Sequence, residues 1–131
     1  MKILIVEDDF VNRLILQKIL DPFGKCDIAV NGREAVSACE LALQEGSNYD
    51  LICMDIMMPE MDGREALRLI REMEKANGIL PAQEAKIIMI TALDTPKDVI
   101  EAFYKGGCTS YQVKPVEKRK LLDLLKEVEL I

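Results

Sequence analysis

Several polar residues that could carry phosphoryl chemistry stand directly after short apolar runs of the sequence. They are Glu7, Asp8, Asp9, Asp55, Thr91 and Lys114. Clustered carboxylates repel one another and raise each other's pKa values unless a cation joins them. A hard divalent ion with oxygen ligands, Mg²⁺ first, would relieve that repulsion. A metal, a lysine and a hydroxyl beside a carboxylate suit phosphoryl transfer, in which the carboxylate itself can be the nucleophile.

Most of these residues also have an ordinary structural explanation. The three acidic residues after the first run could be a cluster that the dipole of a following helix favours. Lys114 alone could be a solvated surface lysine, and Thr91 alone could simply end a strand. Asp55 is harder to explain in this way, because it interrupts an apolar strand, where an unpaired carboxylate is costly. The joint placement at strand ends favours a common site.

Five short apolar runs predict the strands that must position these groups. They are Ile3–Val6, Ile28–Val30, Leu51–Met54, Ile87–Ile90 and Tyr111–Val113. Four of them are nearly continuous, as expected for strands that are buried on both faces. Helical segments alternate with them, which predicts a parallel sheet with helices on both faces in one α/β domain. In such a sheet ligands bind beyond the carboxyl ends of the strands, where the polar residues stand.

The helical segments carry apolar stripes and capping residues. Asn31, Asp62 and Thr95 each precede a helical pattern and are predicted to cap it, with Pro96 in the first helical position after Thr95. In the first helical segment, the spacing of the apolar residues predicts a buried stripe, with Lys18 at its solvent-exposed edge. This stripe comprises Val11, Leu14, Ile15 and Ile19.

The composition excludes several functional classes. The 131 residues include 17 Lys+Arg, 23 Asp+Glu, four Cys and no His, with a net charge of −6. Without histidine there is no Ser-His-Asp triad and no His-ligated zinc or haem. The negative charge argues against direct binding to nucleic acid or to an anionic membrane. Cysteines without a C-x-x-C pair predict reduced, mostly buried thiols and a cytoplasmic location, and no apolar run approaches the length of a membrane helix.

Four motifs contain the polar residues in order along the chain. They are Ile3-Leu4-Ile5-Val6-Glu7-Asp8, Asp55-Ile56-Met57-Met58-Pro59-Glu60-Met61-Asp62-Gly63, Ile90-Thr91-Ala92 and Tyr111-Gln112-Val113-Lys114-Pro115. With these motifs essentially the whole chain resembles the receiver domains of two-component response regulators. The resemblance implies a flavodoxin-like, doubly wound sheet of five parallel strands in the order 2-1-3-4-5 with five helices. It also implies one receiver domain over residues 1–131, with no output domain in this chain.

The resemblance implies a metal site and a phosphoryl acceptor. Glu7 and Asp8 resemble the acidic pair that holds Mg²⁺, or Mn²⁺ in its place, with Asp8 as a direct ligand and Glu7 acting directly or through water. Asp55 resembles the residue that accepts the phosphoryl group and also contacts the metal. The backbone carbonyl of Met57 resembles a further metal ligand.

The resemblance also implies roles for the residues after the last two strands. Thr91 and Lys114 resemble the two residues that contact the phosphoryl group, and Tyr111 resembles the aromatic residue whose rotamer follows Thr91. A cis peptide bond is expected before Pro115. Met57 and Leu93 occupy the family's positions that flank the phosphoryl group. Both are apolar and cannot orient an attacking water, which predicts slow dephosphorylation.

The function that the resemblance implies is a signalling switch. A histidine kinase or phosphotransfer protein would present a phosphohistidine, Asp55 would take its phosphoryl group, and changed contacts with a downstream protein would carry the signal. Beyond catalysing its own phosphorylation and slow dephosphorylation, such a domain is not an enzyme. The chain could also be a receiver fragment of a larger regulator or of a hybrid kinase.

Other classes that use related chemistry lack their signatures in this sequence. An aspartate-nucleophile phosphatase usually carries D-x-D-x-[TV] after the first strand, where this chain has Glu7-Asp8-Asp9-Phe10-Val11. A flavodoxin-like FMN carrier needs hydroxyl and amide groups there, and acidic residues would repel its phosphate. A P-loop nucleotidase is excluded because Cys26 follows Gly24-Lys25 where the motif needs Ser or Thr.

Overall fold

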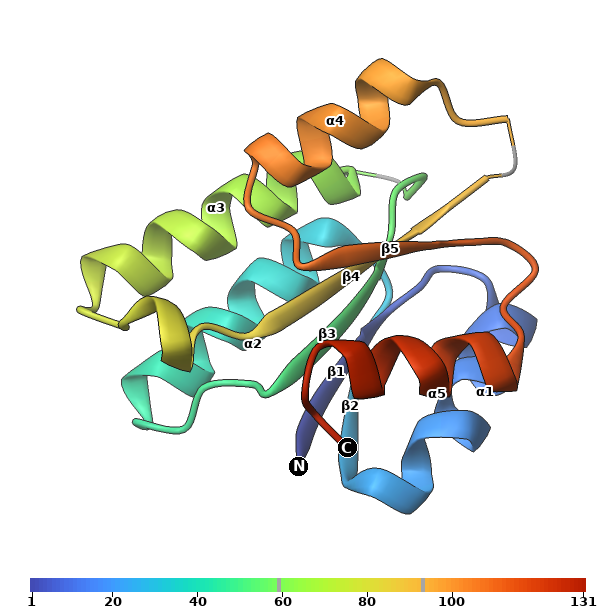
Figure 1. The fold of residues 1–131 in the computed structure, drawn as a ribbon. Coiled ribbons are helices and arrows are strands. Elements are labelled where there is room, and N and C mark those ends of the chain that lie inside the picture. Colours follow the sequence, from blue (N-terminus) through green and yellow to red (C-terminus); the bar gives the residue numbers. More distant parts are fainter. Residues whose placement is uncertain (59, 93) are drawn as a thin grey trace.

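The computed structural model describes residues 1–58, 60–92 and 94–131. Within these ranges, strands and helices alternate along the chain (Figure 1). The strands are β1 (Lys2–Val6), β2 (Lys25–Ala29), β3 (Leu51–Asp55), β4 (Lys86–Thr91) and β5 (Ser110–Val113). The α-helices are α1 (Phe10–Leu20), α2 (Gly32–Gln44), α3 (Gly63–Ala76), α4 (Lys97–Lys105) and α5 (Lys118–Glu127), with short 3₁₀ helices η1 (Asp21–Phe23) and η2 (Pro81–Gln83).

The five strands form one parallel sheet in the order β2-β1-β3-β4-β5, which confirms the predicted topology. Pairing in register brings Asp55 of β3 beside Ile90 of β4. The strand β2 begins at Lys25, three residues before the predicted run, and ends before Val30. It lies at the edge of the sheet and is only partly buried, so its first residues need not be apolar.

Helices cover both faces of the sheet, as predicted. The helices α1 and α5 pack on one face, and α2, α3 and α4 pack on the other (Figure 1). Alternate residues of the central strands serve the two cores, because successive side chains of a strand point to opposite faces. Ile3 and Ile5 of β1 belong to the core under α1 and α5, whereas Leu4 and Val6 belong to the other.

The predicted apolar stripe of α1 is wrong except for Ile19. The residues of this helix that face the core are Leu16, Ile19 and Leu20. These three residues also have helical spacing, and α1 carries more apolar residues than one face can bury. The surplus apolar side chains lie exposed on its outer surface. They are Phe10, Val11, Leu14 and Ile15.

The helix starts follow two of the three predicted caps. The side chain of Asn31 accepts a hydrogen bond from the backbone of Glu34, and that of Asp62 accepts from the start of α3. The prediction for Thr95 is wrong, because Pro96 has an extended backbone and itself precedes the first helical residue. Gly63 lets α3 start close to the sheet, since a Cβ there would lie 2.5 Å from the carbonyl oxygen of Asp55.

The four cysteines are free thiols, and three of them are buried. Burial raises the pKa values of Cys39 and Cys53 to about 12 and that of Cys108 to about 11, so these thiols are protonated and unreactive. Their buried positions agree with the sequence prediction. None of the helices within the described ranges has the length and apolar character that a membrane crossing needs.

Candidate functional site

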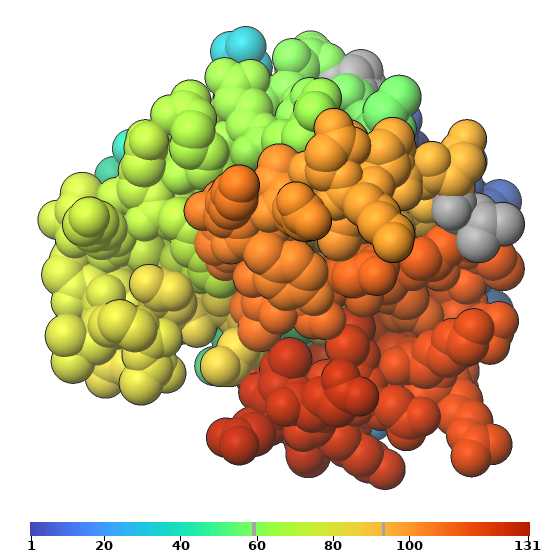
Figure 2. Space-filling view, turned by 45° about the horizontal axis from the view of Figure 1, so that its top comes forward, coloured from blue at the N-terminus to red at the C-terminus, as the bar shows by residue number. Residues whose placement is uncertain are grey.

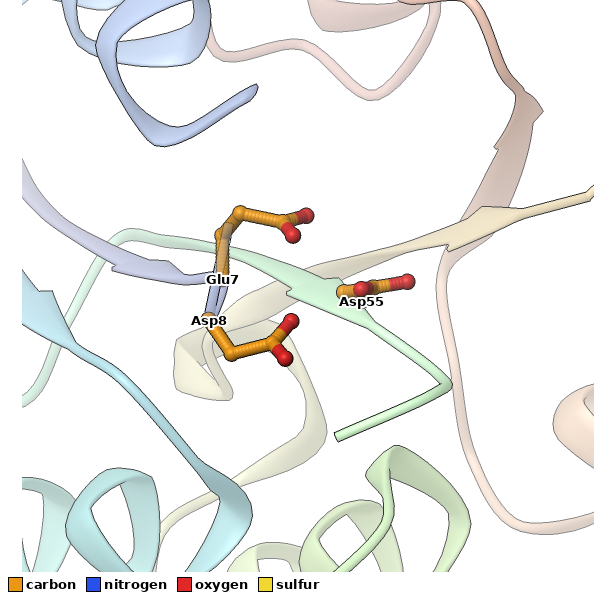
Figure 3. Close-up of side chains that lie close together, drawn as sticks. All are labelled: Glu7, Asp8 and Asp55. Carbon is orange, nitrogen blue, oxygen red and sulfur yellow. The ribbon is translucent and has the colours of Figure 1, made fainter. Parts of the chain in front are cut away.

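Three predicted site residues converge at the carboxyl ends of neighbouring strands. Glu7 and Asp8 follow β1, and Asp55 is the last residue of β3. One carboxylate oxygen from each lies within 4.8 Å of the other two. Figure 3 shows Glu7 and Asp8 extending from the end of β1 toward Asp55. Glu7 and Asp55 are buried, whereas Asp8 is exposed, so the cluster opens to solvent on one side.

Glu7 is held in an environment that suits a cation. Its Oε1 accepts a hydrogen bond from the backbone N–H of Asp9 at 3.2 Å, while its buried Oε2 has no hydrogen-bond partner. Burial, and next the neighbouring Asp55 carboxylate, raise the pKa of Glu7 to about 7. A buried, unpartnered carboxylate oxygen among other carboxylates fits a hard divalent cation. The donor set therefore fits Mg²⁺.

Lys114 brings a positive charge to the same cluster. Its Nζ lies 3.3 Å from Asp55 Oδ2 and 3.6 Å from Glu7 Oε2. The residue directly follows β5, and its backbone N–H donates to the Thr91 carbonyl at 2.7 Å. The peptide bond between Lys114 and Pro115 is cis, as the family resemblance implied. The lysine is therefore fixed at the sheet edge close to both buried acids.

Thr91 lies at the end of β4, but its hydroxyl is turned toward β5. The residue is buried, and its Oγ1 donates a hydrogen bond to the Gln112 carbonyl at 3.4 Å. Tyr111, the residue before Gln112, is at the surface and contacts the ring of Tyr104. The structure thus brings Glu7, Asp8, Asp55 and Lys114 together, whereas the Thr91 hydroxyl and the Tyr111 ring are engaged elsewhere.

A cleft of about 530 Å³ opens beside Asp55. Met57, which is 78% exposed, and Lys114 line it together with apolar residues of β4 and α4. Arg64 also lines the cleft and is a residue that the sequence reasoning missed. The signal for it was the Asp62 cap, which puts Arg64 in the first turn of α3 at the same sheet edge.

Two further predictions concern residues near the cleft. Asp9 is a candidate by its place after the first strand, but the family resemblance gives it no role, and its side chain caps α1 by accepting from the backbone of Asn12 at 2.9 Å. Pro59 of the second motif and Leu93, expected to flank the phosphoryl group, lie outside the described residues. The charged residues of the site therefore come from the ends of β1, β3 and β5 and the start of α3, and β4 and α4 complete the cleft.

Comparisons with known proteins identify a family that matches this chain. The family model described as "Response regulator receiver domain" matches residues 3–126. "Two-component response regulator 24" of Arabidopsis thaliana is 40% identical over 127 residues, which cover 95% of this chain and 81% of the relative. Histidine kinases are also among the relatives, and the chain spans only 6% to 15% of their length.

Solved structures share the fold. The receiver domain of the sensor histidine kinase PA1611 from Pseudomonas aeruginosa, with a magnesium ion in its active-site cleft, is 31% identical with a TM-score of 0.76, covering 96% of this chain and 94% of that chain. The receiver domain of Ssk1 from Saccharomyces cerevisiae, crystallised with the histidine phosphotransfer protein Ypd1, is 30% identical with a TM-score of 0.82. That match covers 97% of this chain and 87% of the other.

Proposed function

The chain belongs to the receiver domain family of two-component response regulators, and from this membership we propose that Asp55 is its phosphoryl acceptor. The observation that carries the proposal is the buried Asp55 carboxylate, which lies 3.3 Å from Lys114 at the edge of an open cleft. A carboxylate in this position can act as a nucleophile, while the lysine offsets the negative charge of the incoming group.

The transfer that we propose begins with a phosphohistidine of another protein, since this chain contains no histidine. A carboxylate oxygen of Asp55 attacks the phosphorus and forms an acyl phosphate. The bond from phosphorus to the imidazole nitrogen breaks, its electron pair stays on that nitrogen, and the imidazole is released. With a small donor such as acetyl phosphate, the chain catalyses the same transfer to itself. The donor protein is a histidine kinase or a phosphotransfer protein, the class of protein crystallised with Ssk1.

The metal that the cluster would hold is Mg²⁺, with Mn²⁺ able to replace it. Glu7, Asp8, Asp55 and the Met57 carbonyl are the proposed ligands, supported by the oxygen-only cluster and by the unpartnered Glu7 Oε2. When bound, the ion neutralises charge on the carboxylates and on the transferred phosphoryl group. Asp8 is exposed and Glu7 is buried, so Asp8 is the ligand that meets solvent.

The response that we propose starts at Thr91. Its hydroxyl exchanges the Gln112 carbonyl for a phosphoryl oxygen, and Lys114 pairs with the same phosphoryl group. Tyr111 then moves inward, and the surface formed by α4, β5 and α5 presents different contacts to a downstream protein. The four free thiols support a reducing compartment, and we place the chain in the cytoplasm.

The donor protein requires a docking surface next to Asp55, and we propose the exposed side of α1. This helix begins directly after the acidic residues and exposes Phe10, Val11, Leu14 and Ile15. Ile28 of the edge strand β2 is also exposed and pairs with Ile5, which faces α1. Several large apolar side chains exposed on one helix are typical of a protein interface.

The proposal is tested by incubating the chain with acetyl phosphate and Mg²⁺ and measuring its intact mass. We expect a stable gain of one phosphoryl group in the wild type and none in Asp55→Asn. The control is Asp123→Asn, an exposed change on α5 that should behave as the wild type. Release of inorganic phosphate without a stable adduct would instead indicate an aspartate-nucleophile phosphatase, and an unchanged Asp55→Asn would overturn the proposal.

A further inference from the structure

Tyr104 and Tyr111 form an aromatic pair at the molecular surface. Tyr104 lies in the last turn of α4 and is 48% exposed, and Tyr111 lies in β5 and is 36% exposed. Their ring centroids are 6.2 Å apart, and the ring planes meet at 82°. This is the edge-to-face arrangement that aromatic pairs favour. The contact joins a helix to the edge strand that leads to Lys114.

The surrounding packing fixes both partners of this pair. The register of β4 and β5 puts Tyr111 opposite Met89, which belongs to the core that α4 covers. Phe103, the neighbour of Tyr104, is buried in the same core and anchors the end of α4. Figure 2 shows α4, β5 and α5 (orange to red) as one continuous exposed surface. Tyr104 is therefore held beside the outward position of the Tyr111 ring.

The residue after Tyr111 engages Thr91 at the same time. The hydroxyl of Thr91 donates to the carbonyl of Gln112 at 3.4 Å. In the proposed function the Thr91 hydroxyl contacts the phosphoryl group. Here it is hydrogen-bonded to β5, while the Tyr111 ring packs against Tyr104 of α4. Two neighbouring contacts of β5 therefore involve the two residues to which the proposed function assigns the response, Thr91 and Tyr111.

We propose that Tyr104 is a positioning residue that holds the Tyr111 ring outside and favours the unphosphorylated arrangement. The inference rests on the proposed function, in which Tyr111 moves inward after Thr91 turns. That movement separates the two rings, so the energy of their contact opposes it. A pair of this kind changes the ratio of outward to inward Tyr111 by about two- to tenfold. Tyr104 acts through Tyr111 and not at Asp55.

The test uses the full chain labelled with 3-fluorotyrosine, which gives three fluorine resonances because the chain has three tyrosines. Beryllofluoride with Mg²⁺ serves as the probe for the phosphoryl group. In Tyr104→Ala we expect a larger inward fraction of Tyr111 and half-saturation at a beryllofluoride concentration about two- to tenfold lower. Tyr104→Phe keeps the ring and should match the wild type, as should Glu101→Ala, an exposed change on the same helix.

The outcomes separate this inference from the proposed function. Normal beryllofluoride binding with an unmoved Tyr111 population in Tyr104→Ala overturns the role of Tyr104 alone, and so does a shift toward the outward form. If the alanine variant does not fold, Tyr104→Leu keeps apolar bulk without an aromatic ring, and the same shift is expected of it. A wild type that takes up neither beryllofluoride nor a phosphoryl group from acetyl phosphate overturns the proposed function, and this inference with it.

Discussion

Glu7 is the residue in which burial and charge are most directly opposed. It is buried beside Asp55, and its Oε2 has no hydrogen-bond partner although Lys114 lies 3.6 Å away. Without a metal, protonation is the simplest relief of this repulsion, which is why burial and Asp55 raise its pKa to about 7. A divalent cation would relieve it without a proton. Glu7 therefore links protonation, metal binding and stability.

The stability of the metal-free chain should fall as the pH rises from about 4.5 to about 7. In this range the folded chain keeps a proton on Glu7 that the unfolded chain, with its ordinary pKa of 4.5, has released. The loss should amount to about 1–3 kcal/mol. It is measured by urea unfolding in EDTA at several pH values. Glu7→Gln cannot ionise and should lose this part of the pH dependence, so equal slopes for the two proteins would contradict the prediction.

The lifetime of the acyl phosphate depends on what can orient water in the cleft. Met57 is exposed there and offers no hydrogen bond to water. Met57→Asn supplies a polar group that can orient water but cannot take its proton, so it should shorten the lifetime about tenfold, less than the roughly 10²-fold or more of a positioned general base. The decay of the purified phosphoprotein measures it by intact mass. Met57→Leu is the apolar control. Equal acyl phosphate lifetimes in Met57→Asn and Met57→Leu would contradict the role of the polar group.

At this scale the sequence predicted which residues meet but not how each side chain is turned. Carboxylates at the ends of β1 and β3 must approach each other in a parallel sheet, so the cluster of Glu7, Asp8 and Asp55 followed from the strand assignment. The direction of the Thr91 hydroxyl did not follow, because it depends on a carbonyl of the edge strand β5. Arg64 was missed because the sequence does not show that a cleft opens beside Asp55. The Asp62 cap does place Arg64 in the first turn of α3, at the same edge of the sheet.

Among the elements, α1 shows most clearly where a sequence pattern is ambiguous. Its apolar residues fit two different stripes with helical spacing, and the periodicity alone cannot choose between them. Packing against the sheet selects the stripe of Leu16, Ile19 and Leu20. The other apolar residues are left exposed beside the site, which is the reason to regard them as an interface. The capping residues Asn31 and Asp62 were predictable because a side-chain cap is a local interaction.

The exposed face of α1 predicts a difference between protein donors and small donors. Val11→Asp introduces a charge at a residue that is 61% exposed and near the helix start, where the dipole tolerates an acid. Transfer from the phosphohistidine protein that serves the wild type should slow about tenfold, since a charge would be buried in an apolar contact. Transfer from acetyl phosphate should not change. Phosphotransfer rates from the two donors measure this difference.

A matched control for that experiment lies on another helix. Leu41 of α2 is 55% exposed, and α2 packs on the opposite face of the sheet from α1. Leu41→Asp should leave both transfer rates at the wild-type level. Equal slowing by Val11→Asp and Leu41→Asp with the protein donor would show that the surface of α1 is not specific.

In the molecule as a whole, the candidate site and a cluster of buried polar contacts around Glu74 lie at opposite ends of the sheet. The site lies at the carboxyl ends of the strands. At their amino ends, the buried carboxylate of Glu74 accepts hydrogen bonds from the Asn48 side chain, the Ala85 backbone and Arg71. Arg71 in turn donates to the Gly107 carbonyl at 2.8 Å. One buried acid thus connects α3 to the segments that enter β3, β4 and β5.

The topology of the whole chain was predictable from the sequence, whereas this anchor was not. Alternating apolar runs and helical segments leave few arrangements for a parallel sheet, and the family motifs fixed the strand order. Glu74 stands in a helix with many charged residues and has no motif around it. Its position four residues after Ile70 puts it on the buried face of α3. A charged residue there is ordinarily exposed, however, and the groups that satisfy Glu74 lie on loops that are distant in sequence.

The separation of the two ends predicts that stability and chemistry can be changed independently. Glu74→Ala removes the acceptor of three hydrogen bonds and takes the short ion-pair partner from Arg71, which keeps the Gly107 carbonyl and the longer contact to Glu84, so stability should fall by about 3–5 kcal/mol. Urea unfolding measures that loss. Glu72→Ala, which breaks only an exposed ion pair with Arg68, should cost less than about 0.5 kcal/mol. Below the unfolding transition both variants should take up a phosphoryl group from acetyl phosphate at the wild-type rate. A slow Glu74→Ala under those conditions would mean that the anchor also positions Asp55, and the two ends would then act as one unit.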